Sequence, residues 1–229
     1  MSVLLIVGYG PGISQAVANR YAGAGYSLGL VARDADKLAD AVDRFAADGT
    51  TAAGQTADAG DPAALRKAVG RIRADLGPIT AVLWTAFRGT EVGNVLEARP
   101  EDIEGVFDIG VTGLLACVHE VLDDLKAAPG ASILVANGAL GENTSELDRV
   151  SVFLGGDGVA LQNAAKSKLV GLLAERLREF DIYVGEVTIA GSVAGTATES
   201  PGAIDPARIA DRLWSMAEQR DTTRVRLTE

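Results

Sequence analysis

Short, almost wholly apolar runs recur along the chain, and segments with apolar residues at helical spacing follow them. The first run, residues 3–7, contains only valine, leucine and isoleucine, which is typical of a strand buried on both faces of a parallel sheet. Further strands are predicted at residues 27–32, 50–56, 79–84, 132–136, 182–189 and, at an edge, 224–227. Helices are predicted at residues 13–21, 36–45, 62–72, 100–126, 159–180 and 206–219. This alternation predicts an α/β fold, a doubly wound parallel sheet between two layers of helices.

Three glycines at alternate positions, Gly8, Gly10 and Gly12, separate the first strand from a helix that begins at Ile13. A strand, a glycine-rich turn and a helix in this order form the context of a dinucleotide-binding fingerprint. Glycine allows the backbone to approach a pyrophosphate, whose charge is stabilised by the N–H groups at the start of the helix. Ser14 stands where the last glycine of the fingerprint would fall. We therefore expect residues 8–14 to bind a dinucleotide, although glycine also simply ends strands.

Residues after the second to fourth strands bear on which dinucleotide is expected. Ligands of such sheets lie beyond the carboxyl ends of the strands, which groups the turn with Arg33, Asp58, Ala59 and Ala86. An acidic residue at the end of the second strand would bind a ribose 2′-hydroxyl, but Ala32 occupies that place. The guanidinium of Arg33 suits a 2′-phosphate, which favours NADP over NAD; a solvated surface arginine is the alternative. Asp58 either accepts a hydrogen bond from the adenine amino group or opens a turn.

Composition limits the other classes of function. The formal net charge of −10 disfavours binding to nucleic acid or to an anionic membrane surface. Residues 3–7 lack the length and the basic flank of a signal peptide, and no apolar run reaches the roughly 20 residues of a membrane span, so a cytoplasmic protein is expected. Cys117 and His119 are the only cysteine and the only histidine. No disulfide and no metal site are expected, and a reducing compartment is predicted.

From its first strand to about Thr196 the chain resembles the short-chain dehydrogenase/reductase family. The segments that carry the resemblance are the glycine turn, Leu30–Asp34 in the form of NADP-using members, Asp58-Ala59, Lys166–Leu172, and Ala190–Val193, where alanine replaces a proline. The resemblance implies a Rossmann fold over a single dinucleotide-binding domain, residues 1–229, and a homodimer or homotetramer. It further implies hydride transfer between a nicotinamide and a carbonyl or alcohol carbon, with Lys166 bonded to the nicotinamide ribose and Val193 beside the nicotinamide.

The chain departs from the family at three of the four positions that carry its chemistry. The family's tyrosine supplies or removes the proton, its serine holds the substrate oxygen, and its asparagine supports a proton-relay water. These positions fall at Gln162, Gly138 and Gly110, so Lys166 alone matches. No tyrosine lies between the fifth strand and Lys166. A carboxamide has no titratable proton near neutral pH, so Gln162 cannot replace the tyrosine as proton donor.

Two hypotheses follow, and both leave the small-molecule substrate unknown. The first is an NADP-dependent oxidoreductase with a substituted proton donor. Residues 138–158 are expected to form a long functional loop with an insertion of roughly ten residues, in which Glu142 and Asp157 are the first candidate acids. The second is a non-catalytic NADP(H)-binding sensor, or an inactive subunit of a hetero-oligomer.

Aromatic residues near the expected cleft add a third alternative. Trp84 and Phe87 stand where the floor of the cleft is expected, and they either stack on a ligand or plug the pocket. If Tyr9, Ser14 and Phe87 obstruct the cofactor, the chain is only a scaffold. Residues 190–205 are expected to form a flexible loop, of which residues 192–205 correspond to the substrate lid of the family and are mostly small.

Overall fold

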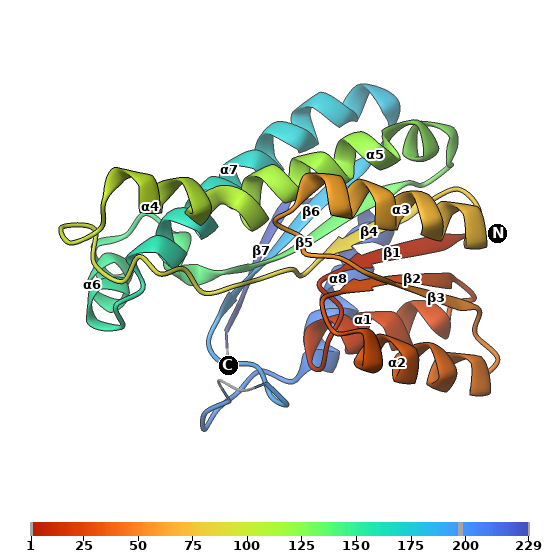
Figure 1. Ribbon diagram of the computed structural model, residues 1–229, viewed down its shortest axis with the longest axis horizontal. Coiled ribbons are helices and arrows are strands. Elements are labelled where there is room, and N and C mark those ends of the chain that lie inside the picture. Colours follow the sequence, from red (N-terminus) through yellow and green to blue (C-terminus); the bar gives the residue numbers. More distant parts are fainter. Residues whose placement is uncertain (1, 197–198, 229) are drawn as a thin grey trace.

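The computed structural model describes residues 2–196 and 199–228, which form a parallel sheet of seven strands with helices on both faces (Figure 1). The strands are β1 (Val3–Val7), β2 (Ser27–Ala32), β3 (Ala52–Thr56), β4 (Ala81–Trp84), β5 (Ser132–Gly138), β6 (Tyr183–Ala190) and β7 (Arg224–Thr228). The α-helices are α1 (Ile13–Ala22), α2 (Ala35–Ala47), α3 (Pro62–Leu76), α4 (Pro100–Glu104), α5 (Leu114–Ala127), α6 (Ser145–Phe153), α7 (Asp157–Leu177) and α8 (Pro206–Gln219). Shorter helical segments are η1 (Gly105–Phe107), η2 (Asp108–Gly113), η3 (Ala139–Gly141) and η4 (Arg178–Phe180).

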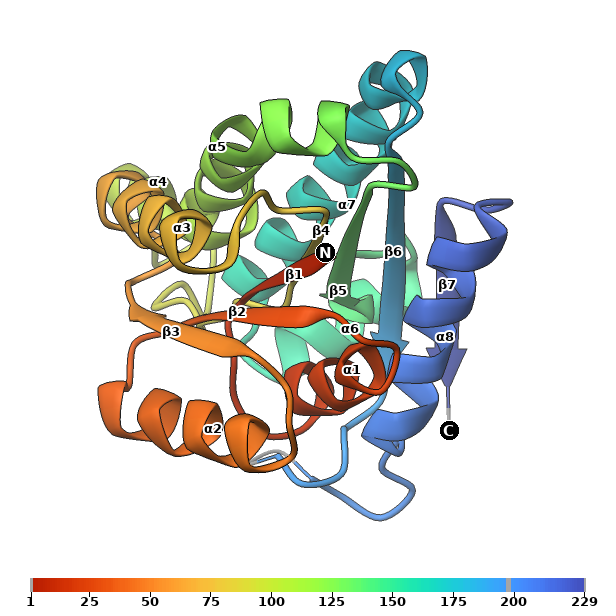
Figure 2. The same cartoon turned by 90° about the vertical axis from the view of Figure 1, so that its right-hand side faces the viewer.

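The strand order is β3-β2-β1-β4-β5-β6-β7. Helices α3, α5 and α7 cover one face of the sheet, and α1, α2 and α8 cover the other (Figure 2). Alternate residues of β1 pack into two apolar clusters: Leu5 and Val7 face α3, α5 and α7, whereas Leu4 and Ile6 face α1, α2 and α8. The predicted doubly wound, three-layer α/β fold is therefore confirmed. Because β1 pairs with both β2 and β4, the strand order reverses beside β1, which is where such folds bind ligands.

The predicted loop at residues 138–158 is wrong in part, because it contains helix α6. The Thr144 hydroxyl caps this helix by accepting a hydrogen bond from Leu147 N at 3.3 Å. Its apolar residues do not form a buried stripe: Phe153 is 88% exposed at the end of the molecule where α4 and α6 lie (Figure 1). Without a buried face, the helical period is hidden in the sequence.

The predicted continuous helix at residues 100–126 is also wrong in part, because its first half consists of α4, η1 and the wide π-helical turn η2. At Gly113 an added Cβ would lie 1.9 Å from the Ala59 carbonyl oxygen, so only glycine lets this segment pass so close to the loop after β3. Taken together, Pro100–Ala127 is long and apolar enough to cross a membrane by length and composition, and half of its apolar window is buried.

The segment between β6 and α8 is held by a bridge between Val193 and Ile204. Val193 is buried and reaches the glycine turn, since an added Cβ at Gly12 would lie 3.9 Å from Val193 Cγ1. The predicted loop at 190–205 also includes residues 197–198, which lie outside the described residues.

Candidate active site and nucleotide crevice

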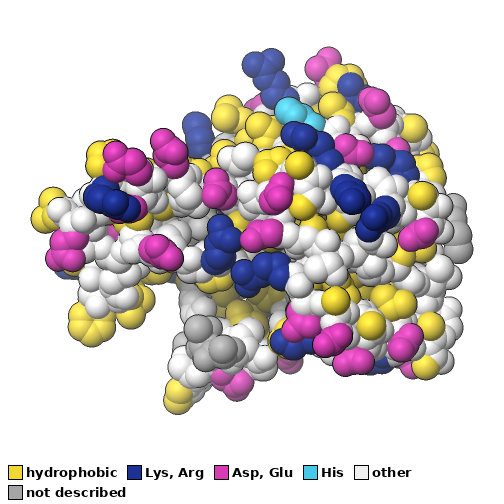
Figure 3. All heavy atoms as spheres, in the orientation of Figure 1, with side chains coloured by type: hydrophobic (Ala, Val, Ile, Leu, Met, Phe, Trp, Pro, Cys, Tyr) yellow, Lys and Arg dark blue, Asp and Glu magenta, His cyan; other side chains and the backbone are white. Residues whose placement is uncertain are grey.

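A crevice of about 190 Å³ opens at the carboxyl ends of β1 to β4. Its lining includes five predicted cofactor residues, Gly8, Arg33, Asp58, Ala59 and Ala86, together with Tyr9, Phe87 and Ile109. Figure 3 shows a hollow at this edge of the sheet, with basic and acidic side chains at its rim. Side chains that are far apart in the sequence therefore meet in one place, because all four strands end at the same edge.

The glycine turn owes its shape to positive backbone angles. Gly8 has a φ of +94° and Gly12 a φ of +84°, values that side-chain-bearing residues rarely adopt. An added Cβ at Gly8 would lie 2.3 Å from Ala86 N, so the turn packs directly on the end of β4. Gly10 has no atom within 4 Å of an added Cβ. The space above Gly10 is the kind of opening that a phosphate needs to reach the backbone.

Helix α1 begins at Ile13 without a side-chain cap on its first N–H groups. Such N–H groups, with the positive end of the helix dipole, form a binding site for an anion. The hydroxyl of Ser14 accepts from Gly10 N and donates to Gly10 O, both at 2.8 Å, so it closes the turn from within. The residues present therefore fit a pyrophosphate.

Tyr9 lies at the wall of the crevice, where its hydroxyl accepts a hydrogen bond from Arg44 Nη2 at 2.7 Å. Burial raises the pKa of the Tyr9 phenol, and Arg44 partly opposes this shift. The phenol is thus protonated at neutral pH and tied to α2, away from the residues of α7.

Arg33 and Asp58 have different surroundings at the rim of the crevice. Arg33 is exposed and forms no ion pair within the part of the chain that the structure describes. Asp58 Oδ1 accepts a hydrogen bond from Gly60 N at 2.8 Å, and its Oδ2 pairs with Arg88 at 3.1 Å. Asp58 therefore opens a turn, one of the two predicted roles, while its outer oxygen is shared with Arg88, a residue that the sequence did not single out.

Lys166 lies inside the fold on α7, with only 2% of its surface exposed. Burial lowers the pKa of its ammonium to about 8, and the negative charge of Glu186 partly opposes the shift. Among the described residues, no hydrogen bond joins the Lys166 Nζ to another group. A buried ammonium without hydrogen-bond acceptors is poorly satisfied, which is typical of a group that contacts a ligand.

Glu186 on β6 is fully buried and anchors a polar cluster that sequence reasoning missed. Its Oε1 accepts from Asn137 Nδ2 at 2.6 Å, and its Oε2 accepts from Ser167 Oγ at 2.9 Å. The Arg224 guanidinium lies 3.4 Å from the same Oε2. A glutamate inside a mostly apolar strand was the available signal, because a buried carboxylate requires partners.

The three positions at which the chain departs from the family pattern lie around α7. Gln162 is 2% exposed, and its Oε1 is buried without a partner among the described residues. An added Cβ at Gly110 would lie 2.8 Å from Gln162 Cγ, and one at Gly138 would lie 2.7 Å from Asn163 Nδ2. Neighbouring side chains of α7 thus occupy the space above both glycines.

Of the four further residues expected near the cleft, Trp84, Phe87, Glu142 and Asp157, only Phe87 lines the crevice. Trp84 is fully buried in the core, so its expected place on the cleft floor is wrong. Phe87 is 57% exposed and does line the crevice. Glu142 forms an ion pair with Arg226 at 3.0 Å, and Asp157 Oδ2 accepts from Val95 N at 2.9 Å. Both carboxylates have structural partners, and neither is buried.

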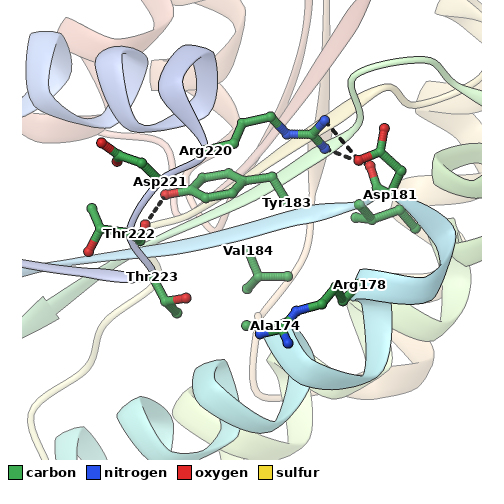
Figure 4. Close-up of a pocket in the computed structure, with 10 residues that line it drawn as sticks. Ala174, Arg178, Asp181, Tyr183, Val184, Arg220, Asp221, Thr222 and Thr223 are labelled. Carbon is green, nitrogen blue, oxygen red and sulfur yellow. Dashed lines mark hydrogen bonds and ion pairs between the residues drawn. The ribbon is translucent and has the colours of Figure 1, made fainter.

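A second pocket, of about 270 Å³, lies at the opposite end of β6 (Figure 4). In this pocket Arg220 forms an ion pair with Asp181 at 3.2 Å, and the Tyr183 hydroxyl donates to the Thr222 carbonyl oxygen at 2.6 Å. Arg220 and Tyr183 are thus held by neighbours within this pocket, which lies at the amino ends of the strands.

Comparison with known proteins connects this geometry to one family. The short chain dehydrogenase family matches residues 2–149. A 3-dehydrosphinganine reductase of Arabidopsis thaliana is 30% identical over 129 residues, which are 56% of this chain and 37% of that protein. A 2,3-dihydro-2,3-dihydroxybenzoate dehydrogenase of Bacillus subtilis (strain 168) is 26% identical over 180 residues, 79% of this chain and 66% of that protein. The chain thus spans between 37% and 66% of the length of these two relatives.

Solved structures share the fold over nearly the whole chain. An alcohol dehydrogenase from the archaeon Thermococcus sibiricus, complexed with 5-hydroxy-NADP, aligns with a TM-score of 0.84 and 20% identity, covering 100% of this chain and 96% of that one. A short chain oxidoreductase from Pseudomonas aeruginosa PAO1 with an atypical catalytic center, bound to NADPH, aligns with a TM-score of 0.84 and 17% identity, covering 99% and 95%. At these identities the likeness shows a common fold.

Proposed function

Because the chain belongs to the short chain dehydrogenase family, we propose that it is an NADP-dependent oxidoreductase in which only Lys166 of the usual four catalytic positions is kept. The assignment of NADP as the cofactor rests on Arg33. This exposed arginine at the end of β2 lines the crevice without an ion-pair partner in the described part of the chain. Its planar set of donors suits a 2′-phosphate. The NADP-containing complexes of the two structural relatives support the same choice.

The residues of the crevice divide the binding of NADP among them. The uncapped start of α1 holds the pyrophosphate, Gly8 and Gly10 keep the backbone open to it, and Arg33 holds the 2′-phosphate. Lys166, by its likeness to the family, bonds the nicotinamide ribose. The bound cofactor supplies or accepts a hydride at a carbonyl or alcohol carbon of a small molecule.

Proton transfer is the step for which the chain lacks the usual group. Gln162 has no titratable proton, and neither glycine at 110 or 138 offers a side chain. We assign the role of proton donor to Lys166. Its pKa of about 8 leaves the ammonium charged at neutral pH, and this pKa is close to the range in which a general acid is effective.

Titration with NADPH and NADH, followed by cofactor fluorescence, tests the cofactor assignment. Arg33→Ala is expected to weaken NADPH binding by about 10- to 100-fold, the value of a charge-assisted hydrogen bond, and to leave NADH binding unchanged. Lys37→Ala is the matched control, since Lys37 is exposed on α2 and paired with Asp34 at 3.1 Å. Equal loss of both cofactors, or no loss of NADPH binding, contradicts the assignment.

A non-catalytic NADP(H)-binding sensor or an inactive subunit is the second candidate function. The buried carboxamide of Gln162 favours it, because this side chain takes the place of the proton donor and packs over Gly110. NADPH oxidation measured across a panel of ketones, aldehydes and activated alkenes separates the two candidates. Binding without turnover supports the sensor, and measurable hydride transfer excludes it.

A cytoplasmic location and a homodimer or homotetramer belong to the same proposal. The assembly is proposed because the family forms its subunit interface from the helices that correspond to α5 and α7. Light scattering coupled to size-exclusion chromatography checks the assembly. A mass equal to the chain mass of 23.6 kDa would show a monomer and contradict it.

A further inference from the structure

Two glycines, Gly110 and Gly138, each lie against a carboxamide side chain of α7, and the two carboxamides occupy consecutive positions of that helix. A Cβ added at Gly110 would meet Gln162 Cγ at 2.8 Å, and a Cβ added at Gly138 would meet Asn163 Nδ2 at 2.7 Å. Real Cβ atoms almost never lie so close to another heavy atom. Each carboxamide therefore occupies the space that the side chain missing at the glycine would take. At Gly138 the occupying atom is itself a hydrogen-bond donor.

The Asn163 side chain is buried and incompletely bonded. It is 3% exposed, and its Oδ1 has no hydrogen-bond partner among the described residues. Its backbone carbonyl accepts from Asn137 Nδ2 at 2.9 Å, so the main chain of α7 is fixed against β5 at this point. A buried amide oxygen without a partner is unfavourable, and natural proteins keep such groups chiefly where a ligand supplies the partner.

Lys166 follows Asn163 by three residues, so the two side chains leave the same face of α7. Together they offer a neutral amide and an ammonium on buried side chains, and the amide oxygen has no hydrogen-bond partner among the described residues. An amide and an ammonium side by side bind an oxygen atom: Nδ2 donates to a carbonyl oxygen, and Oδ1 accepts from a hydroxyl. The same side chain thus serves either member of a carbonyl–alcohol pair without changing its charge.

We propose that the Asn163 carboxamide binds the reacting oxygen of a ketone or secondary-alcohol substrate, in the place of the side chain that Gly138 lacks. This inference rests on the proposed function, because it assigns a residue to the substrate of that reaction. Removal of a single donor to a reacting oxygen typically lowers kcat by about 10²- to 10³-fold.

The first test measures contact without turnover. Protein saturated with NADP⁺ is titrated with cyclohexanone, which the oxidised cofactor cannot reduce, and the side-chain amide resonances are followed by ¹⁵N NMR. The Asn163 resonance, assigned by its loss in Asn163→Leu, is expected to shift, and the Kd of cyclohexanone is expected to rise roughly tenfold in Asn163→Leu. Asn143→Leu changes an exposed position beyond β5. In this variant the shift of the Asn163 resonance and the Kd of cyclohexanone are both expected to equal those of the parent.

The outcomes separate this inference from the proposed function. A stationary Asn163 resonance up to the solubility limit of cyclohexanone, with NADP⁺ bound, overturns the role of Asn163 and leaves the oxidoreductase proposal standing. Failure of NADP⁺ itself to bind overturns the proposed function, and this inference with it.

The second test transfers the hydrogen-bond donor from position 163 of α7 to position 138 of β5, where the family has its serine. Gly138→Ser alone brings its Cβ against Asn163 Nδ2, so we expect the melting temperature to fall by at least about 2 °C. Adding Asn163→Ala empties that space and restores the melting temperature. If Asn163 binds the substrate oxygen, the double variant also binds cyclohexanone more tightly than Asn163→Ala alone, because the serine hydroxyl replaces the amide.

A merely structural role predicts a different result. The double variant would then regain its melting temperature with no gain in cyclohexanone binding over Asn163→Ala. Equal melting temperatures of Gly138→Ser in the presence and absence of Asn163 would show that the two positions do not share one space. Either result overturns the proposal.

Discussion

The two ends of the ligand-binding edge are built in opposite ways. Beside β2 and β3 the crevice is open, and its charged residues Arg33 and Asp58 are at least partly exposed. Beside β5 and β6 the polar residues Gln162, Asn163 and Lys166 are all at most 3% exposed. The first end offers backbone and charge to a ligand, whereas at the second end side chains of α7 occupy the spaces above Gly110 and Gly138.

This difference shows how the two ends tolerate change. At the first end Arg33 stands at the end of its own strand without an ion-pair partner in the described residues, so it can change without removing a partner from another charged group. At the second end the groups share space and partners: Gln162 fills the volume above Gly110, and Glu186 is bonded by Asn137 and Ser167. Replacement of one buried member there alters its neighbours, as expected for a network in a close-packed interior.

The largest effect is expected at Gly8, where the open end depends on backbone geometry. Gly8→Val imposes a β-branched side chain on a φ of +94° and directs its Cβ to within 2.3 Å of Ala86 N. We expect a loss of at least about 3 kcal/mol in the free energy of unfolding, measured in urea, together with loss of NADPH binding.

Gly10→Ala is the matched control for that change. No atom lies within 4 Å of the added Cβ, so the free energy of unfolding is expected to change by less than about 0.5 kcal/mol. Reduced NADPH affinity at unchanged stability would show that a phosphate approaches Gly10. Equal stability of the Gly8 and Gly10 variants would contradict the packing argument.

The next largest effect concerns the closed end and depends on pH. Burial lowers the pKa of Lys166 from its usual 10.5 to about 8, so the folded state holds this proton less tightly than the unfolded state. Below pH 8 both states are protonated and the full penalty, about 3 kcal/mol, opposes folding. Between pH 8 and about 10.5 the folded state alone loses the proton, so the penalty falls as the pH rises.

Lys166→Met removes this penalty, since Glu186 keeps Asn137, Ser167 and Arg224 as partners. The variant is expected to exceed the parent in unfolding free energy by about 3 kcal/mol at pH 7, with the difference vanishing above pH 10.5. Lys168→Met, at an exposed position two residues away, is expected to show no such dependence. A constant difference across this pH range would contradict the assigned burial of the Lys166 charge.

The smallest effect is expected at the Arg88–Asp58 pair of the open end. Both side chains are about two-fifths exposed, at 41% and 39%, so solvent screens the attraction. Arg88→Ala is expected to lower the free energy of unfolding by only about 0.2–1 kcal/mol, and less at 1 M salt. Because Arg88 holds the outer oxygen of Asp58, a change in NADPH affinity larger than this value would indicate that the pair orients Asp58 for the adenine.

Much of the fold could be predicted because its signals are local. The apolar runs at residues 3–7 and 132–136 are strands, and the three layers follow from the alternation of periods. Helix α6 escaped prediction because its apolar residues face solvent, and the break at η2 escaped because it depends on Ala59, more than fifty positions earlier in the chain.

In the candidate site, too, the residues that could be predicted are those with a local signal in the sequence. Gly8, Arg33 and Asp58 were identified because each follows a strand, and the structure brings them into one crevice. Trp84 was misplaced because its position at the end of an apolar run does not tell which face of the sheet its side chain occupies. Glu186 was overlooked because its partners come from β5, α7 and β7, which no local pattern connects.

By itself the sequence determined the order of strands and helices along the chain, the glycine turn with Arg33 behind it, and the absence of a tyrosine between the fifth strand and Lys166. These are properties of neighbouring residues and of residue type, which short-range sterics and chemistry suffice to interpret. Only the tertiary structure decided that Gln162 and Asn163 fill the spaces above Gly110 and Gly138, and that Glu186 lies buried beside Lys166. Such decisions depend on close packing between distant segments, where a volume left by one residue is taken by whichever side chain the fold brings against it.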